Sequence, residues 1–127
     1  EGKPMEDIAS TLLPRLVGPG ALPEGVQLAT FCQSQVHAAT WRRALETMRS
    51  FDRRSALTQI AAPTLLVAGE HDRVAPPATL EAMAHILAGA HSVTLPGAGH
   101  LPHLEQPEAF DELLIDFLRT TRARALH

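Results

Sequence analysis

The second half of the chain alternates between short apolar runs and segments with helical spacing. A continuous apolar run at 64–68 predicts a short strand with no polar face, so both of its faces should be covered. A second short strand is predicted over 92–95. Apolar residues three and four apart predict helices over 78–88 and from 107 to about 120. The residues expected to face the interior are Leu80, Met83, Ala84 and Leu87, and Phe110, Leu113, Leu114, Phe117 and Leu118. Strand, helix and strand in this order predict parallel strands with a right-handed crossover.

The first half of the chain predicts helices and loops without strands. Residues 5–17 have amphipathic spacing, although Pro14 argues against an intact helix to the end of that segment. Further helices are expected over 23–36 and about 39–51. We therefore expect an α/β protein divided into a helical segment, 1–55, and an α/β unit, 56–127. Because two strands do not form a stable sheet alone, the unit should be part of a larger doubly wound sheet.

Composition and charge exclude several classes of partner. The 127 residues are 45% hydrophobic and 20% charged, with a net charge of -3, which is typical of a globular domain and argues against nucleic acid or anionic membrane as a partner. No apolar run is long enough to span a membrane. The single cysteine, Cys32, favours a cytoplasmic location and is expected to be buried. The first residue is Glu1, so we expect the chain to begin inside a longer protein.

Candidate chemistry lies in the two loops that follow the predicted strands. Asp72 follows the first strand and His100 follows the second. Functional groups in open α/β sheets gather beyond the carboxyl ends of the strands, so these side chains should meet. A carboxylate that holds one ring nitrogen of a histidine leaves the other nitrogen to accept a proton from a hydroxyl group or water. The pattern predicts a general-base pair.

These two loops also carry a resemblance to a known family. The segment Gly-Glu-His-Asp at 69–72 is similar to the acid loop of α/β-hydrolases, and Gly-His-Leu-Pro-His-Leu-Glu-Gln-Pro at 99–107 resembles the segment around their catalytic histidine. The resemblance implies the C-terminal part of an α/β-hydrolase core after a helical cap segment, with His100 and Asp72 catalytic and no cofactor. Within the family, the cap segment and Phe-Asp-Arg-Arg-Ser-Ala-Leu at 51–57 most resemble small esterases and enol-lactonases of aromatic-acid breakdown, which implies a small ester or lactone substrate.

The family's serine nucleophile has no counterpart in these residues. Its Gly-x-Ser-x-Gly turn is absent around every serine, namely Ser10, Ser34, Ser50, Ser55 and Ser92. We therefore expect this chain alone to be inactive, and its partner to be the N-terminal half of the same protein or a second copy in a homo-oligomer. Two alternatives stay open: an enzyme of the same fold with another reaction (acyl transfer, dehalogenation or carbon–carbon cleavage), and a non-catalytic interaction domain.

Several other side chains have competing interpretations. Trp41, Val74 and Leu101 are candidate substrate-binding residues, although Trp41 could equally anchor the packing of the cap. Glu70 is a rival to Asp72 as the acid. His71, His100 and His103 could be taken for a metal cluster, but they lack the spacing of a helical zinc motif, so no metal site is expected. Glu105 is expected to bind backbone donors near the start of the last helix, with no catalytic role.

Overall fold

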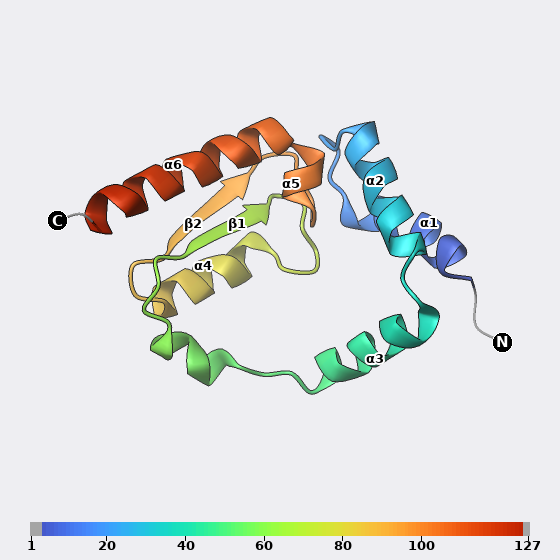
Figure 1. Ribbon diagram of the computed structural model, residues 1–127, viewed down its shortest axis with the longest axis horizontal. Helices are drawn as coiled ribbons and strands as arrows, with labels where there is room; N and C mark the ends of the chain where they lie inside the picture. The colour runs from blue at the N-terminus through green and yellow to red at the C-terminus, as the bar shows by residue number, and fades with distance from the viewer. Residues whose placement is uncertain (1–3, 126–127) are drawn as a thin grey trace.

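The computed structural model describes residues 4–125. The first half of the described chain is helical, and two short strands lie in the second half, separated by a helix (Figure 1). The elements are α1 (Met5–Leu16), α2 (Pro23–Ser34), α3 (Ala38–Arg49), the 3-10 helix η1 (Arg54–Gln59), β1 (Leu65–Gly69), α4 (Pro77–Ile86), β2 (His91–Leu95), α5 (Pro102–Glu105) and α6 (Pro107–Ala125).

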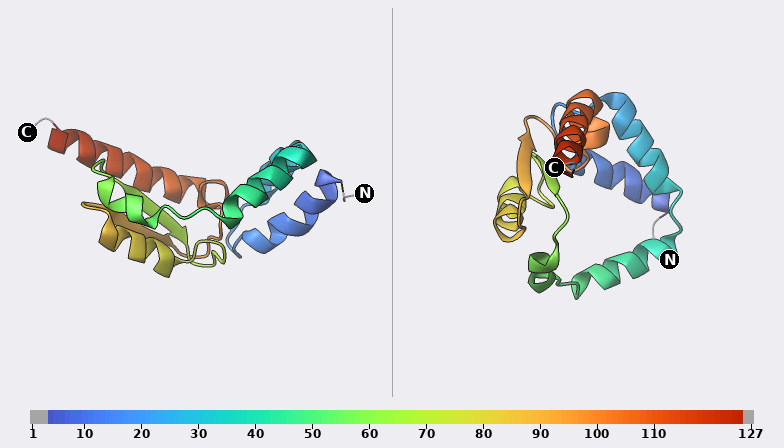
Figure 2. Two further views of the ribbon diagram at one scale, coloured as in Figure 1. Left: turned by 90° about the horizontal axis from the view of Figure 1, so that it is seen from below. Right: turned by 60° about the vertical axis from the view of Figure 1, so that its left-hand side comes forward.

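The strands β1 and β2 are parallel, as the strand–helix–strand pattern predicts. Leu65 lies opposite His91, and the pairing continues to Gly69 opposite Leu95. Helices α4 and α6 lie on opposite sides of this small sheet (Figures 1 and 2). Both strands end toward α5, α1 and α2, so the loops that follow them reach the same edge of the molecule (Figure 1). The fold class is α/β, as predicted, with a two-stranded parallel sheet between helices.

The expected burial of the strand and of the last helix is only partly correct. Leu65, Leu66 and Val67 are half-buried instead of buried. Leu114 and Leu118, expected to face the interior from α6, are 38% and 55% exposed. A groove of about 470 Å³ runs between α6 and the strands, near their amino ends. The cause is incomplete cover: among the described residues β1 pairs with β2 alone, so its other edge has no neighbouring strand.

Helices α1 and α2 pack against each other around a small core of Ala9, Leu13 and Ala29. The expectation that Pro14 interrupts the first helix is wrong, because α1 continues to Leu16. Pro14 lies in the last turn, where it removes a single backbone hydrogen bond, and buried Leu13 next to it holds the turn in place. Cys32 is exposed on α2, and so the expectation that it is buried is also wrong.

Helix α3 stands apart from the sheet in both views and has no buried residue (Figures 1 and 2). Its apolar face is open to solvent, with Leu45 and Met48 at 44% and 66% exposed. Within residues 4–125, no helix has the length and apolar character needed to cross a membrane.

Candidate active site

The acid loop, residues 70–76 between β1 and α4, holds Asp72 in place through its backbone. Directly after β1, the Asp72 N–H donates to the carbonyl of Gly69 at 3.1 Å. Its Oδ1 accepts hydrogen bonds from the N–H groups of Val74 and Ala75 at 2.8 and 3.0 Å. The side chain is 6% exposed. The carboxylate is therefore fixed by its own loop, and Oδ2 remains for another partner.

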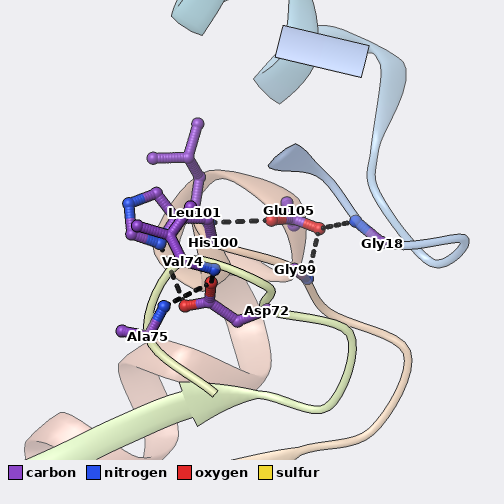
Figure 3. Close-up of polar contacts among 8 residues, drawn as sticks. All are labelled: Gly18, Asp72, Val74, Ala75, Gly99, His100, Leu101 and Glu105. Carbon is purple, nitrogen blue, oxygen red and sulfur yellow. Dashed lines mark hydrogen bonds and ion pairs between the residues drawn. The ribbon is translucent and has the colours of Figure 1, made fainter. Parts of the chain in front are cut away.

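That partner is His100, in the loop after β2, residues 96–101, called the histidine loop below. Its Nδ1 lies 2.9 Å from Oδ2 of Asp72 (Figure 3). The contact predicted from the two strand-end loops is confirmed. Gly97 in the same loop has a φ of 74°, a left-handed conformation that favours glycine and turns the chain back toward the acid loop. The His100 side chain is 34% exposed, and no residue of the described chain forms a hydrogen bond with its Nε2.

The charge of Asp72 is stabilised in this arrangement. Burial raises the pKa of its carboxyl group, but hydrogen bonds from His100, Ala75 and Val74 oppose burial, and the net result is a pKa below the ordinary value. Asp72 is thus an anion at neutral pH and an acceptor only. His100 must carry a proton on Nδ1 to make the bond, which leaves Nε2 as the proton acceptor. The pair can therefore act as an oriented general base.

The rival acid and the metal interpretation find no support in the geometry. Glu70 accepts the Gly97 N–H at 2.9 Å and forms no hydrogen bond or ion pair with His100, whose partner is Asp72. His71 lies 3.7 Å from the Glu70 carboxylate, whereas His103 makes an edge contact with the ring of Phe110, with centroids 5.9 Å apart. The described part of the chain contains no group of three or more potential ligands placed to hold a metal ion.

The three candidate substrate-binding residues are not all brought together. Val74 and Leu101 lie beside His100 (Figure 3), and the Val74 side chain is exposed. Trp41 is half-buried on α3, the helix that stands apart from the sheet (Figure 1). The groove beside α6 lies at the amino ends of the strands, so it does not belong to this site.

Glu105 makes more contacts than the sequence indicates. Its side chain is fully buried, and its carboxylate accepts the N–H groups of Gly18, Gly99 and Leu101 (Figure 3). The prediction that it binds backbone donors is confirmed, but the donors lie in the histidine loop and after α1, not in the last helix. The sequence alone does not indicate that the α1–α2 connection meets the histidine loop; Gly18 and Gly99 only permit the close approach of the two backbones.

The sequence is similar to a known protein family and to several curated proteins. The family described as "Alpha/beta hydrolase family" matches residues 3–113 of the sequence. A pimeloyl-[acyl-carrier protein] methyl ester esterase of Xanthomonas oryzae is 35% identical over 77 residues, which are 61% of this chain and 30% of that protein. A pyrrolizixenacetamide deacetylase of Xenorhabdus hominickii is 34% identical over 85 residues, 67% of this chain and 32% of that protein.

Solved structures give the same result. The enol-lactonase from Burkholderia xenovorans superposes with a TM-score of 0.81 at 27% identity, covering 91% of this chain and 45% of that one. A thermophilic esterase from Thermogutta terrifontis superposes with a TM-score of 0.79 at 29% identity, covering 91% and 44%. The chain thus spans about a third of the curated relatives it matches and less than half of these structures.

Proposed function

The chain belongs to the alpha/beta hydrolase family, and from this premise we propose that it supplies the base and the acid of a hydrolytic site. His100 acts as general base and then as general acid, and Asp72 orients it. The nucleophile, a serine, and the backbone donors that stabilise the oxyanion come from residues outside these 127. The single observation that carries the proposal is the 2.9 Å contact between Asp72 Oδ2 and His100 Nδ1, with Nε2 left open.

The reaction follows from the orientation of the ring. As the serine hydroxyl attacks the substrate carbonyl, Nε2 takes its proton, and the imidazolium that forms is stabilised by the Asp72 carboxylate. Nε2 then gives the proton to the leaving oxygen, the carbon–oxygen bond breaks, and an acyl-serine remains. Water then attacks the acyl-serine carbonyl while Nε2 takes a proton from the water. Nε2 gives this proton to the serine oxygen, the acyl–serine bond breaks, and the acid is released.

The bond we propose is an ester or lactone. An esterase and an enol-lactonase stand among the similar proteins, and both names describe a carbonyl carbon bonded to a leaving oxygen. An imidazole with an open Nε2 suits that chemistry, because the leaving oxygen of an ester or lactone needs the proton that Nε2 carries after the first step.

We propose in addition that residues 1–55 form the cap over this site. Support comes from α1 and α2, which pack beside the histidine loop: the His100 N–H donates to the carbonyl of Leu16 at 2.7 Å. Trp41 on α3 stays a candidate substrate contact on the same segment.

The test uses the full-length gene product, which includes whatever sequence accompanies these residues. A fluorophosphonate probe should label one serine outside the 127 residues, and the protein should hydrolyse p-nitrophenyl esters or an enol-lactone. Labelling should be lost in His100→Ala, because the serine needs its base. Absence of both labelling and hydrolysis, with Asp72 and His100 still in contact, would favour the non-catalytic alternative. An aspartate in place of the serine would indicate dehalogenation.

A further inference from the structure

We propose that Glu105 is a positioning residue that ties the histidine loop to the connection between α1 and α2, so that the alignment of His100 with Asp72 depends on residues 16–22. The inference rests on the proposed function for its catalytic consequence. Its structural content can be measured without any turnover.

The Glu105 carboxylate holds the backbone on both sides of His100. Its Oε2 accepts the Gly99 N–H at 2.8 Å and its Oε1 accepts the Leu101 N–H at 2.8 Å. These are the residues immediately before and after the histidine. With both neighbours fixed, the ring of His100 can vary only through its own side-chain torsions, and Asp72 restrains these.

The same carboxylate reaches the α1–α2 connection. Oε2 also accepts the Gly18 N–H at 2.7 Å, and the Glu105 carbonyl accepts the Leu22 N–H at 3.1 Å. His100 completes the link, since its N–H donates to the carbonyl of Leu16 at 2.7 Å. Glu105 is therefore an anchor shared by two segments that are more than 80 residues apart in sequence.

Backbone packing between the two segments leaves no room for a side chain. A Cβ at Gly18 would lie 2.2 Å from the Gly97 carbonyl oxygen, and one at Gly99 would lie 2.3 Å from the Leu16 carbonyl oxygen. Both obstacles are backbone atoms, which cannot move aside as a flexible side chain could. The α1–α2 connection therefore docks on the histidine loop in one position.

The chemistry of the side chain argues for more than packing. A fully buried carboxylate is costly unless hydrogen bonds compensate it, and an apolar residue would fill the same volume at lower cost. Three N–H donors converge on this carboxylate, and no cation of the described chain pairs with it. Only a carboxylate has two oxygens that can both accept hydrogen bonds from these N–H groups. A glutamine has one acceptor oxygen, so Glu105→Gln must set an NH₂ group against at least one N–H donor.

The first measurement is amide hydrogen exchange on the unaltered full-length protein. The N–H groups of Gly18, Gly99 and Leu101 should exchange as one unit, with protection factors within about threefold of each other. The amide of Gly89 is an internal control, because it is exposed and makes no hydrogen bond among the described residues. Rapid exchange at Gly18, with Gly99 and Leu101 still protected, would overturn the proposal, since the connection would not be tied to the loop.

The second measurement is the proton NMR signal of the His100 ring N–H that faces Asp72, expected far downfield of the amide region. Glu105→Gln and Gly18→Ala should each broaden or abolish this signal in folded protein. Glu108→Gln, the same change at an exposed position three residues away, should retain it. Folded variants of Glu105 and Gly18 that keep the signal unchanged would refute positioning and leave Glu105 a purely structural residue. If neither variant folds, the exchange measurement decides alone.

In the full-length protein, Glu105→Gln should lower kcat about 10- to 100-fold with KM nearly unchanged, because a small misplacement of the base affects the chemical step. Failure of the proposed function has a different signature: ester hydrolysis that is absent or independent of His100, with the exchange and NMR results as described above.

Discussion

Replacing Asp72 with asparagine should invert the tautomer of His100 while leaving the loop in place. Oδ1 of Asp72 accepts two backbone N–H groups, from Val74 and Ala75, whereas Oδ2 accepts one ring N–H, from His100. An asparagine has a single carbonyl oxygen for these two positions. If the oxygen turns toward the backbone, it keeps both hydrogen bonds from Val74 and Ala75, and the NH₂ group of the asparagine then faces Nδ1 of His100.

The opposite orientation is much less favourable. It would leave two backbone donors facing an NH₂ group at a site that is 6% exposed. At about 1–3 kcal/mol for each buried unsatisfied donor, the first orientation is preferred by about 2–6 kcal/mol. Nδ1 must then accept a hydrogen bond, and the ring proton moves to Nε2. A ring protonated on Nε2 cannot accept a proton from the nucleophile, so kcat of the full-length protein should fall about 10⁴-fold.

The tautomer can be observed directly on this chain. Nitrogen-15 chemical shifts of His100 distinguish a protonated from an unprotonated ring nitrogen. The unaltered chain should show a protonated Nδ1 at neutral pH, and Asp72→Asn should show a protonated Nε2. The reasoning is refuted if the substituted chain is folded and keeps its proton on Nδ1, or if kcat falls less than tenfold.

Three further predictions concern the chain as a whole. It should not hydrolyse p-nitrophenyl acetate at enzymatic rates, and a robust rate that survives His100→Ala would show that another nucleophile is present. The folded-state pKa of Asp72 is below its ordinary value of 3.8, so its contribution to stability is present above that pH and is lost as the pH falls through the lowered pKa. The difference in free energy of unfolding between the unaltered chain and Asp72→Asn should therefore shrink on acidification. Urea melts in which this difference stays constant or grows would contradict the prediction. The accessible surface of 9122 Å² is about 2,500 Å² more than a compact monomer of 13.7 kDa should expose, so the isolated chain should associate through at least about 800 Å² per partner; a monodisperse monomer with a cooperative melt, by light scattering and calorimetry, would contradict this.

Most of the fold and the central contact could be predicted from the sequence, because both depend on local pattern. The apolar run before Gly69 and the helical spacing after it determine strand, helix and strand, and topology then brings Asp72 and His100 to one edge. The ends of most elements differ from prediction by one or two residues, as is usual where helices fray.

What could not be predicted depends on contacts between distant segments. Nothing in the local sequence around Gly18 indicates that it donates to Glu105, 87 residues away. Burial was overestimated for the same reason. Leu66 and Cys32 lie in apolar stretches, but apolar character shows only that a residue would be stabilised by burial, and the cover depends on segments that pack from elsewhere.

The central claim is that His100 is the base of a hydrolytic site completed by a nucleophile outside these residues. The most direct test compares His100→Ala with His103→Ala in the full-length protein. His103 is a matched control, because it is a histidine three residues away that contacts Phe110 and not Asp72. We expect His100→Ala to lower kcat for ester hydrolysis by about three or more orders of magnitude with little change in KM, and His103→Ala to remain within a few-fold of the unaltered protein. A loss near tenfold in His100→Ala, or equal losses in both variants, would contradict the account.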